Sequence, residues 1–174
     1  MESQARTASA QQAGRFNEEI VEVTTTMAVK DKESGVVSQV EATVSSDTCN
    51  RPGTTYEGLA KLQPVMGEGK YVTAGNASQL SDGASACVMM EAKEAERLGL
   101  EPLGAFRGFA VSGCEPDEMG TGPVFAVPRL LERTGMKMAD IDLWELHDAF
   151  ASQAVSCQPQ LGVTEHTLNV HAAS

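Results

Sequence analysis

Two short polar segments hold the residues that could take part in chemistry, and the first is the loop 74–83, AGNASQLSDG. It brings small side chains, hydroxyls and backbone N–H groups together between an expected strand and an expected helix. Such a cluster of donors suits a polar or anionic ligand. A simpler interpretation is that Ser81 and Asp82 only cap the following helix. The loop alone leaves both interpretations open.

The second segment is 145–151, ELHDAFA, where an expected strand meets an expected helix. Ligands of α/β proteins gather at the ends of strands, so His147 could donate a hydrogen bond to a developing oxyanion or carry a proton near neutral pH. The alternative is a histidine that merely caps the helix, although histidine is not among the preferred capping residues. Both interpretations stay open here as well.

The remaining histidines and the cysteines show no pattern typical of a metal or redox site. His166 and His171 lack the spacing that metal ligands favour, so no metal is expected. The four cysteines are widely separated, without the paired spacing of a zinc knuckle or a redox dithiol. We expect reduced thiols, with Cys87 in the core on an apolar helix face and Cys114 in a loop.

Composition excludes several classes of protein. The chain has 174 residues, with 13 Lys and Arg against 24 Asp and Glu, a formal net charge of −11. This charge repels phosphate backbones, so nucleic acid is not an expected partner. No apolar run approaches the roughly 20 residues of a membrane-spanning helix, and the first residues lack the pattern of a secretory signal. A cytoplasmic location is expected.

The elements around the two polar segments follow from hydrophobic patterning. Residues 2–16 predict an exposed helix, β-branched runs predict strands at 19–29 and 36–44 that could pair as a hairpin, and 56–63 predicts a short helical turn. From residue 71, strands at 71–74, 106–111 and 141–146 alternate with helices at 84–97, 123–134 and 149–158. The alternation predicts a layered α/β fold. The chain stops just after an apolar strand start at 168–170, which suggests a truncated chain.

Several motifs stand in an order that resembles the thiolase family, the acyl-CoA acyltransferases. They are YVTAGNASQLSDG at 71–83, MGTGP at 119–123 and IDLWELHDAF at 141–150, supported by GRFNEEIVEV at 14–23 and RPGTTYEGLAKLQPV at 51–65. The resemblance implies an αβαβα layered core of two similar halves, with a loop domain that covers coenzyme A. Residues 1–68 resemble the end of the loop domain, 69–100 the end of the first half, and 101–174 the start of the second half.

The resemblance also implies roles for individual residues. Arg51 resembles the loop-domain arginine near the adenine end of coenzyme A. The segment lining the pantetheine corresponds to Ala74, Ala77 and Ser78, and the residues beside the thioester to Ala149 and Phe150. His147 stands where most of the family has the asparagine of the NEAF motif, which holds a water in the oxyanion hole; the sterol-carrier type of thiolase has a histidine there. Coenzyme A and acyl-CoA are implied as substrates, with no permanently bound cofactor.

Departures from the family pattern are equally informative. The 174 residues contain neither the nucleophilic cysteine motif that precedes the loop domain nor the GHP and CxG motifs of the second half. Asp148 replaces the usual glutamate, and alanines stand at 172–173 where the family has a glycine-rich turn. We therefore expect that this chain alone is incomplete and inactive in 3-oxoacyl-CoA thiolysis or acyl-CoA condensation, and that it works as a homo-oligomer or with a complementing chain. The alternative is a non-catalytic half-thiolase that binds acyl-CoA or a partner.

Overall fold

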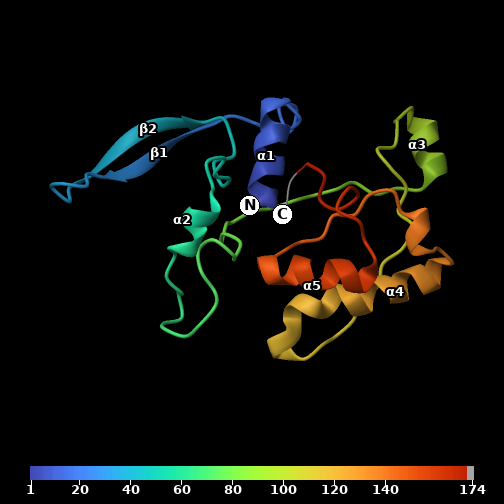
Figure 1. Ribbon diagram of the computed structural model, residues 1–174. Coiled ribbons are helices and arrows are strands. Elements are labelled where there is room, and N and C mark those ends of the chain that lie inside the picture. The colour runs from blue at the N-terminus through green and yellow to red at the C-terminus, as the bar shows by residue number, and fades with distance from the viewer. Residues whose placement is uncertain (172–174) are drawn as a thin grey trace. The chain divides into compact units, whose positions relative to one another are not determined.

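The computed structural model describes residues 1–171, so the alanines predicted to disturb a turn at 172–173 lie outside the described residues. The chain divides into two compact units, one formed by Met1–Leu62 with the segment from Asn169, the other by Gln63–Leu168. The first unit contains α1 (Glu2–Gln12), β1 (Val23–Lys30), β2 (Val37–Val44) and α2 (Tyr56–Ala60) (Figure 1). The predicted first helix and the two predicted strands are thereby confirmed.

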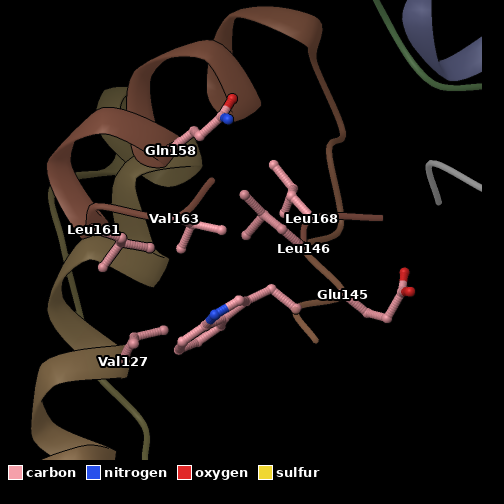
Figure 2. Close-up of a pocket in the computed structure, with 8 residues that line it drawn as sticks. Val127, Glu145, Leu146, Gln158, Leu161, Val163 and Leu168 are labelled. Atoms are coloured by element: carbon pink, nitrogen blue, oxygen red, sulfur yellow. The ribbon is translucent and has the colours of Figure 1, made fainter. Parts of the chain in front are cut away.

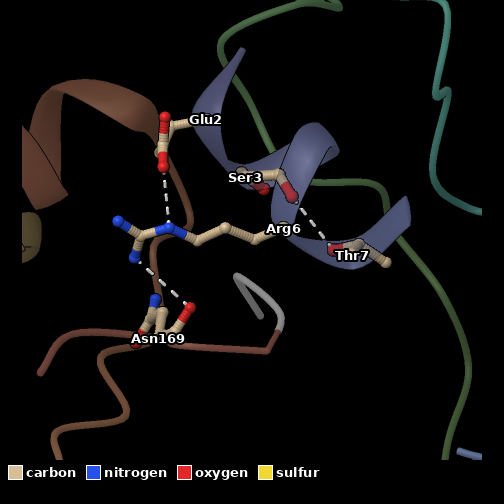
Figure 3. Close-up of polar contacts among 5 residues, drawn as sticks. All are labelled: Glu2, Ser3, Arg6, Thr7 and Asn169. Atoms are coloured by element: carbon tan, nitrogen blue, oxygen red, sulfur yellow. Dashed lines mark hydrogen bonds and ion pairs between the residues drawn. The ribbon is translucent and has the colours of Figure 1, made fainter. Parts of the chain in front are cut away.

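Helix α1 is held by polar contacts along one side. Arg6 lies one turn after Glu2, and its Nε is 2.9 Å from a Glu2 carboxylate oxygen. The Arg6 guanidinium also donates to the Asn169 carbonyl at 3.4 Å, which ties the segment from Asn169 to this helix (Figure 3). The Thr7 hydroxyl donates to the Ser3 carbonyl at 3.0 Å. The bond from Arg6 therefore links α1 to Asn169, which lies 163 residues later in the chain.

Strands β1 and β2 form an antiparallel hairpin whose register runs from Val23 opposite Val44 to Lys30 opposite Val37. Asp31 organises the turn, because its carboxylate accepts hydrogen bonds from the Ser34 N–H and the Ser34 hydroxyl, both at 2.7 Å. These bonds hold the pKa of Asp31 below its usual range. Gly35 completes the turn with a φ of 72°, which a residue with a Cβ adopts only under strain.

The second unit is helical and contains α3 (Ala92–Leu98), α4 (Gly122–Thr134) and α5 (Ala151–Leu161), with short 3-10 helices at Pro116–Thr121 and Met138–Asp140. Helices α4 and α5 both end at glycines in the left-handed conformation, Gly135 and Gly162. Its core is a small apolar cluster of Cys157, Leu161, Val163 and Leu168, against which side chains of α4 and of the segment around Trp144 pack. The predicted helices at 123–134 and 149–158 are confirmed.

The described residues mix helix and strand but do not form the predicted layered sheet. The hairpin is the only sheet in residues 1–171, and the segments 71–74, 106–111 and 141–146 form no strand. A strand persists only where a neighbour accepts and donates its backbone hydrogen bonds, and these segments have no such ladder. Only isolated bridges form, between Ala77 and Phe150 and between Trp144 and Leu168. The fold shown is a mixed fragment of helices and one hairpin.

The predicted helix at 84–97 is wrong in its first half, since α3 begins at Ala92 after Glu91. Residues 84–90, ASACVMM, are apolar except for Ser85, so a helix here would need burial on most of its surface. Nothing described covers them, and Val88 is 86% exposed. Cys87 is accordingly exposed and not part of the core. Ser81 and Asp82 lie too far from α3 to cap it, so that interpretation of the loop is also wrong.

Candidate functional site

The first polar segment folds into a tight turn around Asn76. The Asn76 side chain accepts a hydrogen bond from the Thr73 N–H at 2.8 Å and donates one to the Tyr71 carbonyl at 2.9 Å. The Thr73 hydroxyl accepts from the Gly75 N–H at 3.2 Å. Asparagine is suited to this role because its amide both donates and accepts. Ala74 lies exposed in the turn that results.

The two polar segments lie side by side, although about 70 residues separate them in sequence. The Ser78 N–H donates to the Ala149 carbonyl and the Ala151 N–H donates to the Asn76 carbonyl, each at 2.9 Å. Ala77 and Phe150 face each other in an antiparallel bridge. Five of the predicted site residues thus belong to one local assembly: Ala74, Ala77, Ser78, Ala149 and Phe150.

His147 is exposed and does not cap α5, because Phe150 occupies the N-cap position. The capping interpretation of His147 is therefore wrong. Its backbone carbonyl accepts a hydrogen bond from the Gln153 side chain at 2.8 Å. This bond spans the start of α5 and joins the histidine loop to the helix.

Gln153 is a residue that the sequence interpretation missed. Its Oε1 atom is buried without a hydrogen-bond partner among the described residues. A side chain at Gly120 would bring a Cβ to 3.3 Å from the Gln153 Cβ, so the MGTGP loop approaches α5 closely enough that any other residue there would have to displace Gln153 by a few tenths of an ångström. The Cys157 thiol donates to the Gly120 carbonyl at 3.3 Å. The glycine of that loop was the sequence signal for a close approach.

Two cavities of very different kind lie in the second unit. An open groove of about 690 Å³ runs between the 3-10 helix at Pro116–Thr121, the start of α4 and most of the length of α5, with Met119, Phe125 and Phe150 in its lining. A cavity of about 60 Å³ lies inside the core, and its lining includes Val127, Leu161 and Leu168 (Figure 2). Ligand sites are much larger than the second cavity, which is a packing void.

The pKa of Asp148, which lies between His147 and Ala149, is raised above its ordinary value. Burial raises the pKa of its carboxyl, and a hydrogen bond from its own backbone N–H together with the charge of His147 offsets the rise only in part. The folded chain therefore binds the carboxyl proton of Asp148 more tightly than the unfolded chain does. The resulting stabilisation is complete below about pH 4, the ordinary range of an aspartate, and is lost as pH rises through the raised pKa.

Asp148→Asn is expected to remove this pH dependence and to make the chain modestly more stable at neutral pH than the unchanged protein. The reason is that an amide carries no charge to desolvate. Urea unfolding midpoints measured between pH 4 and 7 check the expectation, with Asp142→Asn at a nearby exposed position as the matched control. If Asp148→Asn keeps the same slope as the control, burial of the carboxyl is not what lowers stability there.

Arg51 belongs to the other unit and is exposed. Its backbone N–H donates to the Gln4 side chain, and its carbonyl accepts from the Thr54 hydroxyl at 2.7 Å. These contacts fix the backbone at the position of the predicted adenine-side arginine. Within residues 1–171 no three His, Cys, Asp or Glu side chains gather in a way that could hold a metal ion. The helices of this same stretch are too short or too polar to cross a membrane.

Two protein-family descriptions together match nearly the whole chain. The family description "Thiolase, N-terminal domain" matches residues 1–93 and "Thiolase, C-terminal domain" matches residues 100–174. Peroxisomal 3-ketoacyl-CoA thiolase B of Mus musculus is 47% identical over 167 residues, which are 96% of this chain and 38% of the mouse protein. The chain thus spans about two fifths of the length of such relatives.

Solved structures agree with the sequence comparison. Human mitochondrial 3-ketoacyl-CoA thiolase is 34% identical with a TM-score of 0.79, the alignment covering 98% of this chain and 40% of that one. The Bacillus anthracis acetyl-CoA acetyltransferase is 33% identical with a TM-score of 0.84, over 98% of this chain and 41% of that one. Both family descriptions, the sequence identity and the structural likeness agree along nearly the whole length, and the chain belongs to the thiolase family.

Proposed function

We propose that this chain forms the acyl-CoA-facing part of a thiolase-type acyltransferase acting on 3-oxoacyl-CoA thioesters or condensing acyl-CoA molecules. The observation that carries the proposal is the bridge between Ala77 and Phe150, with its flanking hydrogen bonds. That bridge unites the two segments to which the family resemblance gives the pantetheine and the thioester. Membership of the family supports acyl-CoA as the substrate class.

Each part of the assembly has a chemical role in this proposal. The small side chains of Ala74, Ala77 and Ser78 let the narrow pantetheine arm run close to the backbone. Ala149 and Phe150 lie beside the thioester, and the His147 imidazole donates a hydrogen bond to the carbonyl oxygen as negative charge develops there. A single donor of this kind contributes about 10² to 10³ in rate. Arg51 supplies positive charge for the adenine end of a ligand that carries several phosphates.

Acyl transfer also needs a thiolate nucleophile and groups that move protons, and their family motifs are not among these 174 residues. We propose that further thiolase residues, in a longer polypeptide or a complementing chain, supply these groups. The 174 residues alone then catalyse neither 3-oxoacyl-CoA thiolysis nor acyl-CoA condensation. A cytoplasmic location and a homo-oligomeric state belong to the same proposal. Binding of acyl-CoA is then the activity that this chain can show by itself.

Titration calorimetry with acetoacetyl-CoA and with free coenzyme A tests the proposal. His147→Ala is expected to weaken acetoacetyl-CoA binding about 5-fold, the value of one hydrogen bond, and to leave coenzyme A binding unchanged because free coenzyme A has no carbonyl at this position. His166→Ala, at another exposed histidine, is the matched control.

Two outcomes of this titration would contradict the proposal. If the unchanged chain binds neither ligand, it is not an acyl-CoA-binding module. If His147→Ala weakens both ligands equally, or no more than His166→Ala does, the imidazole does not meet the thioester carbonyl.

A further inference from the structure

Helix α1 presents two glutamines on one face. Gln4 and Gln11 are seven residues apart, close to two full turns, so their side chains leave the helix in nearly the same direction. Both glutamines are half-buried, whereas Gln12, the next residue of the helix, is exposed. The other side chains on this helix that are apolar are all alanines, so its packing depends on polar contacts.

Gln11 holds the segment that leads from β2 to Arg51, and this segment belongs to the same compact unit. The amide oxygen of Gln11 accepts a hydrogen bond from the Asn50 side chain at 2.8 Å, and its amide nitrogen donates to the Asp47 carbonyl at 3.2 Å. Within the segment, the Cys49 N–H donates to the Asp47 carboxylate at 2.8 Å and closes a turn. One glutamine thus uses both ends of its amide to fix a turn.

Arg51 is held at both of its backbone polar groups. Its N–H donates to the Gln4 side chain. Its carbonyl accepts from the Thr54 N–H at 3.0 Å and from the Thr54 hydroxyl at 2.7 Å. The residue as a whole is nevertheless exposed, so its guanidinium can reach a ligand in solvent. The backbone of Arg51 is therefore fixed by α1 on one side and by the following turn on the other.

The acidity of the chain makes the position of this arginine important. A formal net charge of −11 opposes the approach of a ligand with several phosphates, so positive charge has to lie where the phosphates arrive. A segment that moved freely would have to be ordered when the ligand binds, and the cost of ordering reduces affinity. A segment that α1 already holds in place carries less of that cost.

We infer that Gln4 and Gln11 are positioning residues, which hold Arg51 where it meets the nucleotide end of coenzyme A. The inference rests on the proposed function, because it concerns the arginine proposed there for the adenine end. Both glutamines hold the chain around Arg51, so they act on the ligand only through it. Helix α1 then supports the coenzyme-binding segment.

Calorimetric titration of the 174-residue chain with coenzyme A tests the inference. Arg51→Ala is expected to weaken binding about 10-fold, and Gln11→Ala about 5-fold because the freed segment must be ordered by the ligand. The double variant is expected to bind as weakly as Arg51→Ala and no more, since a residue that acts only through the guanidinium has no effect once the guanidinium is gone.

Gln12→Ala is the matched control, because it makes the same substitution at the next, exposed position of the same helix. Its expected change in the dissociation constant is less than about 2-fold, as for surface positions. Alanine is a better helix former than glutamine, so both single variants preserve α1, and far-ultraviolet circular dichroism checks this.

Amide hydrogen exchange tests the positioning without a ligand. Gln4→Ala removes the acceptor of the Arg51 N–H, so exchange at this amide is expected to accelerate about 5-fold. Gln12→Ala is expected to leave the rate unchanged. Equal rates at the Arg51 amide in the two variants would mean that α1 does not hold this segment.

The titration separates failure of this inference from failure of the proposed function. A chain that binds no coenzyme A overturns both. If Arg51→Ala leaves binding unchanged, the arginine does not meet the nucleotide and the inference is wrong, while binding through the second unit stands. The inference alone is overturned if Gln11→Ala behaves as Gln12→Ala does, or if the double variant shows the product of the two single effects.

Discussion

Acetoacetyl-CoA incubated with coenzyme A and the purified 174-residue chain is expected to remain intact, at a rate about 10⁶-fold below that of a full-length relative. Nucleophile and proton-transfer groups act as a unit, so loss of the unit removes nearly all the catalysis. Cys157 is unsuited as a substitute nucleophile, because it is fully buried and burial raises the pKa of its thiol, which disfavours the thiolate. Loss of the 3-oxoacyl absorbance is the measurement.

A full-length thiolase such as the Bacillus anthracis enzyme serves as the positive control for this assay. Turnover that persists through repeated purification would mean that one of the exposed cysteines, Cys49, Cys87 or Cys114, acts as the nucleophile. Replacing these three by serine one at a time would identify it. In that case the proposal that catalysis needs residues outside this chain is wrong.

Trp144→Ala is expected to lower the free energy of unfolding of the second unit by about 3 kcal/mol, within the usual range for large core residues. The Trp144 side chain packs against the apolar cluster that contains Leu161 and Leu168, and it lines the small core cavity that truncation would enlarge. The backbone bond from the Trp144 N–H to the Thr167 carbonyl, 2.7 Å long, remains in the variant. The loss therefore reports packing alone.

Urea unfolding followed by circular dichroism measures this effect. Leu143→Ala is the matched control, because Leu143 is the preceding residue and is 60% exposed. Its expected change is within about 0.5 kcal/mol, as for surface positions. Since domains of this size have only about 5 to 15 kcal/mol of stability, Trp144→Ala would remove a large share. Equal midpoints for the two variants would mean that the cluster around Cys157 does not hold the unit together.

Helix α4 and the hairpin, whose signals are local, were predicted correctly, whereas the helix predicted at 84–97 was wrong in its first half. Helix α4 has an apolar stripe that includes Val124, Val127 and Leu131, a proline in its first turn and a glycine just after its end, all of them local signals. The hairpin follows equally from β-branched runs on either side of a turn that Asp31 and Gly35 build within a few residues. The order of the motifs around Asn76 and His147 likewise indicated the thiolase family.

The sequence by itself therefore determined α1, α4, α5 and the hairpin, the family, and the residue types of the candidate site. Tertiary structure decided what lies beside what. It joined Ala77 to Phe150, brought Gln153 to the His147 carbonyl, and left 71–74 and 106–111 without strand partners. The physical reason is that a helix satisfies its hydrogen bonds within one segment, whereas a strand or a site contact needs a second segment whose position no local pattern encodes.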